Sequence, residues 1–265
     1  MLTSTQNPLV KEIRKLHKAK GRREQQLFLL EGTHLLEEAC AVDYPLVTVC
    51  CTPEWQEGHQ LLWQDVVFRC QRAELVSQEV LKAIATTVQP EGVVATAQRL
   101  LTSKHPQGLP LLTSMGLALE TVQDPGNLGT IIRSAAAAGT DRVWLSQDSV
   151  DLDNPKVLRS SAGQWFRLPV TVSPDLKDVV YQCQAQGIQV VATVPDATVS
   201  YWEIDLQRPT LILLGNEAAG LSADLVSLAD QQVTIPLCSG VESLNVAIAA
   251  ALMVYEAQRQ RRKKG

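Results

Sequence analysis

Residues 210–222 read TLILLGNEAAGLS, and this stretch decides the fold class of the chain. An apolar run ends abruptly in Gly215, and the polar pair Asn216 and Glu217 follows at once. Ser222 is then suited to cap a helix. A strand that is apolar on both faces must be covered on both sides, as in parallel sheets with a layer of helices on each face. The stretch therefore predicts an α/β fold in which polar groups stand where a buried strand opens to a cleft.

Four similar apolar runs flank this stretch and indicate further strands of the same sheet. They are LALETV (117–122), RVWLS (142–146), IQVVATV (188–194) and QVTIPL (232–237). Helical stretches lie between them, including residues 173–187 and 222–230. Such alternation predicts a parallel sheet, and parallel sheets bind ligands beyond the carboxyl ends of their strands.

The first part of the chain shows a separate and shorter α/β pattern. Residues 7–20 place Leu9, Ile13 and Leu16 on one helical face, with cations opposite. Apolar strand-like stretches follow at FLLEG (28–32), LVTVCC (46–51), VVFRC (66–70) and VVATA (93–97), and between them lie an amphipathic THLLEEAC (33–40) and a helical AELVSQEVLKAIATT (73–87). This pattern predicts a small α/β domain that precedes the larger sheet.

A change in composition marks the boundary between the two patterns. Two prolines, a glycine and several polar residues interrupt the apolar periodicity within residues 98–113. We expect a small domain over residues 1–97, a linker over residues 98–113 and a second domain over residues 114–265.

Composition excludes several classes of protein. The chain has 265 residues, of which 45% are apolar and 20% are charged, which suits packed cores and not disorder or a collagen-like array. Its six cysteines form no CxxC pair and no cluster with histidine, so we expect buried thiols and no metal. The longest apolar run, residues 246–254, is about half of what a bilayer-spanning helix needs. The first residues also lack the apolar core of a signal peptide, so we expect a cytoplasmic protein without membrane contact.

Charge is unevenly distributed along the chain. The net charge is −4, yet residues 1–24 carry a balance of +5 and residues 256–265 a balance of +4. Two basic ends on an acidic body are typical of an electrostatic footprint for nucleic acid. Basic runs are also common as solvated tails that aid solubility, so the charge pattern alone leaves both roles open.

A strand-to-helix turn at residues 120–139, ETVQDPGNLGTIIRSAAAAG, holds the first candidate site residues. Gly126 and Gly129 permit close backbone approach, and the start of the helix offers free N–H groups to an anion or a sugar. Arg133 lies six positions beyond Asn127, so its guanidinium can reach the same opening and bind a phosphate. The alternative is an ordinary tight turn followed by a surface arginine.

Two further strand ends carry polar residues. Glu217 could accept hydrogen bonds from a ligand, pair with Arg133, or simply lie near the positive end of the next helix dipole. Within residues 233–262, Ser243 and Asn245 stand where an almost wholly apolar helix begins. Ser243 fits the N-cap position, whereas Asn245 is less easily explained as a cap. The helix is apolar on most of its circumference, so it must be buried against the sheet or a second subunit.

Together these three segments closely resemble the motifs of a known enzyme family. The segments are DPGNLGTIIR (124–133), LLGNEAAGLS (213–222) and IPLCSGVESLNVA (235–247). In this order and spacing they resemble the SpoU-type (TrmH-like) RNA 2′-O-ribose methyltransferases of the SPOUT superfamily. The likeness covers roughly residues 114–258, and residues 3–32 resemble the start of the substrate-binding domain that precedes the catalytic domain in many members.

The resemblance implies both a fold and an activity. The implied fold is an α/β parallel-sheet catalytic domain with a C-terminal trefoil knot, preceded by a small α/β (L30e-like) substrate-binding domain. The implied activity is that of an RNA (guanosine/ribose-2′-O-) methyltransferase that uses S-adenosylmethionine, with ribosomal RNA favoured over transfer RNA. It further implies a homodimer with catalytic sites near the dimer interface, and no metal.

The resemblance also assigns roles to individual residues. It implies a polar catalytic set made of Asn127, Arg133, Glu217, Ser243 and Asn245. It implies main-chain contacts to the cofactor from Gly215, Ile235 and Leu244, with Thr193 as a further candidate. A guanidinium has a pKa above about 12 and is a poor base, so we favour Arg133 as a phosphate clamp over a general base.

Some alternatives stay open from the sequence. Ser160, Ser161 and Gly163 could form a loop that faces the substrate or a plain helix-ending turn. A transfer RNA 2′-O-ribose methyltransferase and a catalytically silent RNA-binding protein would share the same fold. A dinucleotide-dependent oxidoreductase is disfavoured because the chain lacks both GxGxxG and an acidic residue at the spacing needed to bind a ribose.

Overall fold

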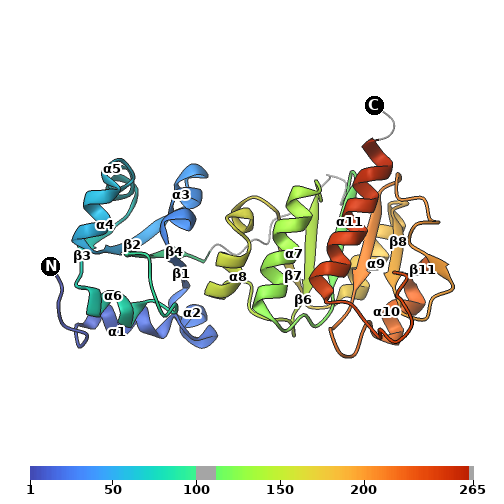
Figure 1. The fold of residues 1–265 in the computed structure, drawn as a ribbon, viewed down its shortest axis with the longest axis horizontal. Helices are drawn as coiled ribbons and strands as arrows, with labels where there is room; N and C mark the ends of the chain where they lie inside the picture. The colour runs from blue at the N-terminus through green and yellow to red at the C-terminus, as the bar shows by residue number, and fades with distance from the viewer. Residues whose placement is uncertain (100–111, 263–265) are drawn as a thin grey trace. The chain divides into compact units, whose positions relative to one another are not determined.

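The computed structural model describes residues 1–99 and 112–262, which fall into two compact units (Figure 1). One unit comprises Met1–Leu101 with Asp151–Phe166, and the other comprises Thr102–Val150 with Arg167–Gly265. Most of the expected linker over residues 98–113 lies outside the described residues, as do Lys263 and Lys264 of the basic C-terminal run.

The first unit is built on a four-stranded sheet with strand order β1-β4-β2-β3. Its strands are β1 (Leu27–Glu31), β2 (Leu46–Cys51), β3 (Arg72–Leu75) and β4 (Val93–Gln98). Its helices are α1 (Pro8–Lys15), α2 (Ala19–Gln25), α3 (Thr33–Ala41), α4 (Pro53–Gly58), α5 (Gln60–Arg69), α6 (Gln78–Ile84) and α8 (Pro155–Ser160), with a 3₁₀ turn η1 (Gln164–Phe166). Along β1, Phe28 and Leu30 join one core cluster while Leu29 joins another, because successive side chains of a strand point to opposite faces.

Three sequence-based expectations for this unit are wrong. The helical stretch expected over residues 73–87 begins in strand β3, and helix α6 starts only at Gln78. The helical pattern over residues 7–20 breaks after Lys15, and α2 begins at Ala19 with its Gly21 packed directly on the α1 backbone. The apolar run VVFRC (66–70) lies at the end of helix α5 and not in a strand. Val66 is fully buried, whereas Val67 is 44% and Phe68 is 90% exposed, so only one of the three apolar side chains faces the core.

The segment Asp151–Phe166 packs with the first unit, although we expected it within the second domain. Its Leu158 and Trp165 join the cluster around Phe28. The rings of Trp165 and Phe28 lie 5.0 Å apart, and those of Tyr44 and Phe166 lie 5.2 Å apart. Long-range apolar contacts such as these are not readable from the local sequence pattern.

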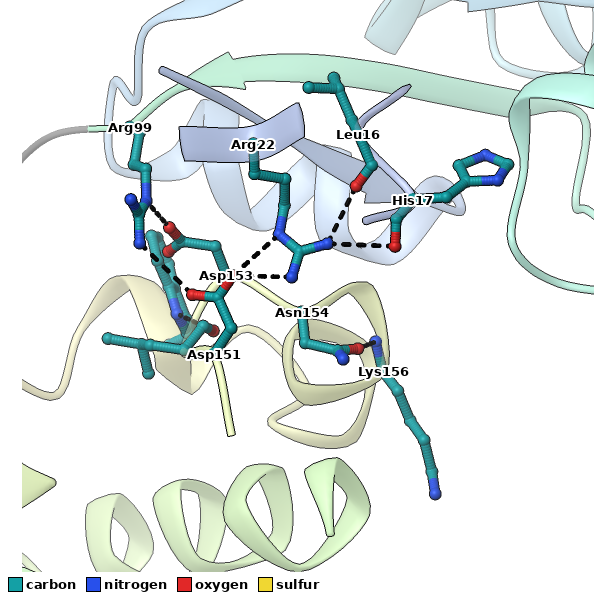
Figure 2. A network of polar contacts seen from close by, with 10 residues as sticks. Leu16, His17, Arg22, Arg99, Asp151, Asp153, Asn154 and Lys156 are labelled. Atoms are coloured by element: carbon teal, nitrogen blue, oxygen red, sulfur yellow. Dashed lines mark hydrogen bonds and ion pairs between the residues drawn. The ribbon is translucent and has the colours of Figure 1, made fainter. Parts of the chain in front are cut away.

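A buried network of charges ties this segment to the rest of the first unit (Figure 2). The Arg22 Nη2 atom lies 2.7 Å from Asp151 Oδ2, and Arg22 is only 2% exposed. Arg99 contacts both Asp151, at 3.3 Å, and Asp153. Burial raises the pKa of Asp153, and the hydrogen bond from Arg99 opposes that rise. Removing one partner of such a buried pair typically costs about 3–5 kcal/mol.

The substrate-facing loop considered for Ser160, Ser161 and Gly163 is instead a helix-ending turn. Ser161 is fully buried, and its hydroxyl donates to the Leu158 carbonyl at 2.7 Å. Gly163 adopts φ +80°, and a Cβ atom there would collide with the Glu38 side chain. Ser161 and Gly163 serve packing, because neither has room for a ligand.

The second unit contains a seven-stranded sheet in which every neighbouring pair is parallel, in the order β7-β6-β5-β10-β8-β11-β9. Its strands are β5 (Met115–Leu119), β6 (Arg142–Ser146), β7 (Val170–Ser173), β8 (Gln189–Thr193), β9 (Val199–Ser200), β10 (Thr210–Leu214) and β11 (Gln231–Thr234). Its helices are α7 (Pro125–Ala137), α9 (Leu176–Ala185), α10 (Ala223–Leu228) and α11 (Val246–Arg262). The predicted parallel sheet and all five predicted strands are confirmed.

The sequence pattern did not predict strands β7 and β9. Both lie at the edges of the sheet, and both are short and partly exposed. Edge strands pair on one side only and need no continuous apolar run, so they leave a weak signal in the sequence.

The register of the central strands brings the three motif segments together. Leu214 of β10 is paired with Leu119 of β5, so both strands end at the same level of the sheet. Helices α9 and α10 pack beside the sheet in one core cluster, and α11 packs against α7. Among the described residues, no helix is both long enough and apolar enough to cross a membrane.

Candidate active site

A chain of three polar side chains links the motif segments beyond the carboxyl ends of β5, β10 and β11. Asn127 Nδ2 donates to Glu217 Oε1 at 2.9 Å, and Asn245 Nδ2 donates to Asn127 Oδ1 at 2.9 Å. The contacts join positions 90 and 118 residues apart in sequence. Asn127 suits the central position because an amide offers a donor and an acceptor at once.

Local sequence fixes where Asn127 stands. Asp124 is the N-cap of α7, and its Oδ1 accepts from the Asn127 backbone N–H at 2.9 Å. Pro125 occupies the first helical position, where its missing N–H costs nothing. Asn127 thus lies in the first turn of α7, with its side chain half-buried and directed to the other two motifs.

Asn245 caps helix α11, which corrects the expectation that Ser243 holds this position. The Asn245 Oδ1 atom accepts from the backbone N–H of Ala247 at 3.0 Å, and α11 begins at Val246. One side chain therefore caps the helix with its oxygen and contacts Asn127 with its nitrogen. Ser243 is exposed and lies in the loop before the cap.

Arg133 is exposed on α7, and no hydrogen bond or ion pair engages its side chain within residues 1–99 and 112–262. The ion pair with Glu217 that the sequence allowed does not form among these residues, because Glu217 accepts from Asn127 instead. The guanidinium therefore keeps all five of its N–H donors for a substrate.

A cavity of about 420 Å³ lies next to this polar chain. All four residues predicted to bind the cofactor line it, as do two of the predicted catalytic residues. These are Thr193, Gly215, Ile235 and Leu244, and Glu217 and Ser243. Asn127, Arg133 and Asn245 do not line it. The predicted site residues thus divide into a cavity group and a group outside it, joined by the Asn127–Glu217 hydrogen bond.

Gly215 gives the cavity wall its shape. A Cβ atom at this position would lie 2.1 Å from the Gly220 carbonyl carbon and 2.2 Å from the Leu221 nitrogen. The loop folds back on itself there, with Asn216 and Gly220 exchanging two backbone hydrogen bonds of 3.0 and 2.9 Å. Only glycine permits so close an approach of two backbone segments.

The cavity suits a cofactor that is held largely by backbone groups. Its volume falls within the range of about 300–1,000 Å³ that is typical of small-molecule sites. Loops after β8, β10 and β11 supply its walls, together with apolar side chains such as Leu214, Leu237 and Val246. The Thr193 hydroxyl donates to the Leu213 carbonyl at 2.9 Å, which holds this part of the wall to strand β10.

A larger open depression of about 610 Å³ lies beyond the ends of β5, β6 and β7. Several carboxylates line it, including Glu120, Asp148 and Asp175, and none of the predicted site residues does. Its one lysine, Lys177, is paired with Asp224 at 3.1 Å. The smaller cavity is the better candidate for the site, because six of the predicted site residues line it and none lines this depression.

None of the six cysteines lines the cavity. Burial raises the pKa of Cys50, Cys51 and Cys183 to about 12, so these thiols stay protonated. Cys238 is exposed, which corrects the expectation that all six are buried. Among the described residues no group of three or more His, Cys, Asp or Glu side chains is arranged to hold a metal ion.

Sequence reasoning missed the residues that join the loop after β5 to the loop after β10. Asn216 Nδ2 donates to the Thr121 carbonyl at 2.8 Å, and Glu120 Oε2 accepts from the Ser222 N–H at 2.7 Å. The only signal in the sequence is their position. Glu120 directly follows strand β5, and Asn216 follows the glycine that ends strand β10.

Comparison with known proteins gives the same assignment as the motifs. The model of the SpoU rRNA Methylase family matches residues 114–255, and that of the MRM3-like substrate binding domain matches residues 7–95. An uncharacterized tRNA/rRNA methyltransferase of Synechocystis sp. is 49% identical over 259 residues, covering 98% of this chain and 93% of the relative. The 23S rRNA (guanosine(2553)-2′-O)-methyltransferase of Bacillus subtilis is 34% identical, covering 96% of this chain and 97% of the relative.

Comparison with solved structures supports the same assignment. The crystal structure of an AdoMet-bound rRNA methyltransferase from Sinorhizobium meliloti matches with a TM-score of 0.85 at 33% identity, over 97% of each chain. The likeness extends over both units and includes the parallel sheet that carries the cavity. The resemblance seen in the three motifs is confirmed, and this chain belongs to the SpoU rRNA methylase family.

Proposed function

We propose that this protein transfers a methyl group from S-adenosylmethionine to a ribose 2′-hydroxyl of ribosomal RNA. The observation that carries the proposal is the Asn127–Glu217 hydrogen bond, which connects the cofactor-sized cavity to the polar groups outside it. The Bacillus subtilis relative named as a 23S rRNA methyltransferase matches over nearly the whole chain, which favours ribosomal RNA over transfer RNA. Action on that substrate would place the protein in the cytoplasm.

The proposed roles follow from where each residue stands. S-adenosylmethionine supplies an already activated methyl group, so the protein's task is to align acceptor and donor. Gly215, Ile235 and Leu244 would hold the cofactor through main-chain groups of the cavity wall, within the predicted knot. Thr193 would help to shape that wall.

The polar groups would orient the ribose. Glu217 uses one carboxylate oxygen for Asn127, and its second oxygen has no partner among the described residues. Ser243 adds an exposed hydroxyl at the cavity, and Asn245 fixes Asn127 from the other side. Arg133 would bind a phosphate of the RNA backbone, a task suited to a free, planar guanidinium.

A methyl-transfer assay tests the proposed function. Purified protein incubated with labelled S-adenosylmethionine and ribosomal RNA should yield a 2′-O-methylated nucleoside after nuclease digestion. Transfer RNA from the same cells should be a poorer acceptor. RNA binding without methyl transfer would support the silent RNA-binding alternative, and retention of a dinucleotide in place of S-adenosylmethionine would support the oxidoreductase.

We propose the surface of α1 and α2 as the electrostatic footprint for RNA in the first unit. Four exposed cations there have no partner among the described residues: Lys11, Arg14, Lys18 and Arg23. Arg22 belongs to the buried network and is unable to reach RNA. In the C-terminal run, two of the arginines are already engaged within the protein: Arg259 pairs with Glu256 at 2.6 Å, and Arg261 donates to Ser114 and to the Arg208 carbonyl.

Removing three of these charges should flatten the salt dependence of RNA binding. For Lys11→Gln, Arg14→Gln and Lys18→Gln combined, the slope of log affinity against log salt should become shallower by about 0.7 to 0.9 for each phosphate that the protein no longer neutralises. The matched control exchanges the same positions between lysine and arginine, which keeps the charge and should keep the slope. An unchanged slope in the glutamine variant would assign these residues to solubility.

We also propose a homodimer in which α11 contributes to the interface. Ile248, Leu252 and Tyr255 are 51%, 36% and 48% exposed, and their spacing places them on one face of the helix. An exposed apolar stripe of this kind is typical of an interaction surface. It begins three residues after Asn245, which agrees with a catalytic site close to the interface.

A charge in the middle of this stripe should separate the dimer. Leu252→Glu would bury a carboxylate at the proposed interface, so sedimentation at micromolar concentration should show monomers where the unmodified chain shows dimers. Gln182→Glu, at an exposed position of α9, is the matched control and should leave the dimer intact. A monomeric unmodified chain would contradict the proposal directly.

A further inference from the structure

Thr121, directly beyond β5, holds a backbone conformation that threonine rarely adopts. Its φ is +56°, in the left-handed region that β-branched residues avoid. Strain of this kind persists only where the surroundings enforce it, and it concentrates at functional sites. Three contacts enforce it here. The Thr121 N–H donates to Ser146 Oγ at 2.7 Å, its hydroxyl donates to Asp148 at 2.7 Å, and its carbonyl accepts from Asn216 at 2.8 Å.

Asp148 is a dependable acceptor in this arrangement. Hydrogen bonds from Ser146 and Thr121 lower the pKa of the Asp148 carboxyl group, so it stays ionised at neutral pH. The end of β5 is therefore pinned on one side by Ser146 and Asp148 and on the other by Asn216.

Asn216 uses both ends of its side chain. Its Oδ1 atom accepts from the backbone N–H groups of Ala218 at 2.8 Å and Ala219 at 3.0 Å, which shapes the loop that walls the cavity. Its Nδ2 atom ties that loop to Thr121. A second tie runs in parallel, since the Ser222 N–H donates to Glu120 at 2.7 Å.

The loop after β10 contacts the segment from the end of β5 to the first turn of α7 twice, through the consecutive residues Asn216 and Glu217. Asn216 holds Thr121, three residues before the N-cap of α7, while Glu217 accepts from Asn127 in the first turn of α7. The Asn216–Thr121 contact therefore fixes the frame within which Asn127 and Glu217 face each other. A shift of the cavity loop along β5 would change both contacts together.

From this geometry we propose that Asn216 is a positioning residue for methyl transfer, setting the cavity loop against the start of α7. The inference rests on the proposed function and deepens it. The residue would act by keeping the cofactor's methyl group in line with the ribose hydroxyl, because a misplacement of about 1 Å can cost about a hundredfold in rate. Asn216 is itself part of the cavity wall, but its side chain is committed to the Thr121 carbonyl and to two backbone N–H groups of its own loop, so it would act through the loop.

The variant Asn216→Asp separates positioning from loop shape. Aspartate keeps the Oδ1 acceptor for Ala218 and Ala219 but loses the donor, and it sets a second oxygen against the Thr121 carbonyl. At saturating RNA and cofactor, we expect turnover to fall by about 10- to 100-fold. The dissociation constant for S-adenosylmethionine should stay within about threefold. Asn7→Asp is the matched control, because Asn7 also accepts a backbone N–H through Oδ1, in the first unit, and should leave turnover unchanged.

A double-mutant cycle with Asn127→Ala provides the decisive readout. If Asn216 acts through the alignment of Asn127 and Glu217, then Asn216→Asp should add little in the Asn127→Ala background, because the alignment is already disrupted. Turnover at the unmodified rate in Asn216→Asp, or full additivity in the cycle, would overturn the inference. A loss of cofactor affinity that accounts for the whole effect would also overturn it. Failure of the proposed function is distinguishable, since the unmodified protein would then methylate no RNA.

Discussion

Replacing Arg133 with alanine should lower methyl transfer by about a hundredfold or more, with little change in cofactor affinity. A bidentate arginine clamp acts by positioning the substrate, and a misplacement of about 1 Å can cost about a hundredfold in rate. Arg133 is exposed and free of partners among the described residues, and it lies outside the cavity. We therefore expect the variant to bind S-adenosylmethionine normally in calorimetry and to fail in single-turnover methylation.

The lysine variant separates a phosphate clamp from a general base. Arg133→Lys keeps the positive charge but loses the bidentate fork, so a clamp should recover part of the rate with an unchanged pH–rate profile. If Arg133 were the base, the profile should move to lower pH, because lysine has the lower pKa. Thr130→Ala, an exposed position of the same helix, is the control and should leave the rate unchanged. A fully active Arg133→Ala variant would make this residue an ordinary surface arginine.

Replacing Asn127 should have an effect of similar size for a different reason. Alanine there removes the two 2.9 Å hydrogen bonds that hold Glu217 and Asn245 in one constellation. We expect turnover to fall about a hundredfold, again with cofactor affinity nearly unchanged because Asn127 does not line the cavity. Normal turnover in Asn127→Ala would show that the polar chain only supports the fold.

The variant Asn127→Asp tests the same contact through pH. It would set a second carboxylate against Glu217, and like charges in contact raise the pKa of one of them. As the pH falls, a proton shared by the pair restores a donor between the two groups. Activity relative to Asn127→Ala should therefore rise toward acidic pH and fall toward alkaline pH. A flat ratio across the pH range would argue against a direct contact between the two positions during turnover.

Much of the second unit was predictable from sequence because its signals are local. Four of the five predicted strands are buried apolar runs, and a helix layer is the usual cover for such runs. Gly215 and Ile235 were predictable as residues of the cavity wall, because each directly follows a strand within a motif. The edge strands β7 and β9 were not, because exposure on one side removes the apolar signal.

The residue that caps helix α11 and the burial of Arg22 were less predictable from the sequence. Ser243 and Asn245 are equally suitable caps by residue type, and the choice depends on where α11 leaves the loop. Arg22 looks like one more cation in a basic run, yet it is buried against Asp151, 129 positions away. Residues that look equivalent in the local sequence therefore take different roles, because each role depends on partners that are distant in the sequence.

The sequence by itself determined the class of fold, the order of the motifs and the family, because these depend on apolar periodicity and on residues close together in the chain. Tertiary structure alone decided that residues 151–166 pack with the first unit, that Asn127 joins Glu217 to Asn245, and that Asn216 pins a strained Thr121. The physical reason is that hydrogen bonds and buried ion pairs depend on distances within about 3 Å. Such distances between residues 90 or more positions apart are set only when the sheet register is fixed.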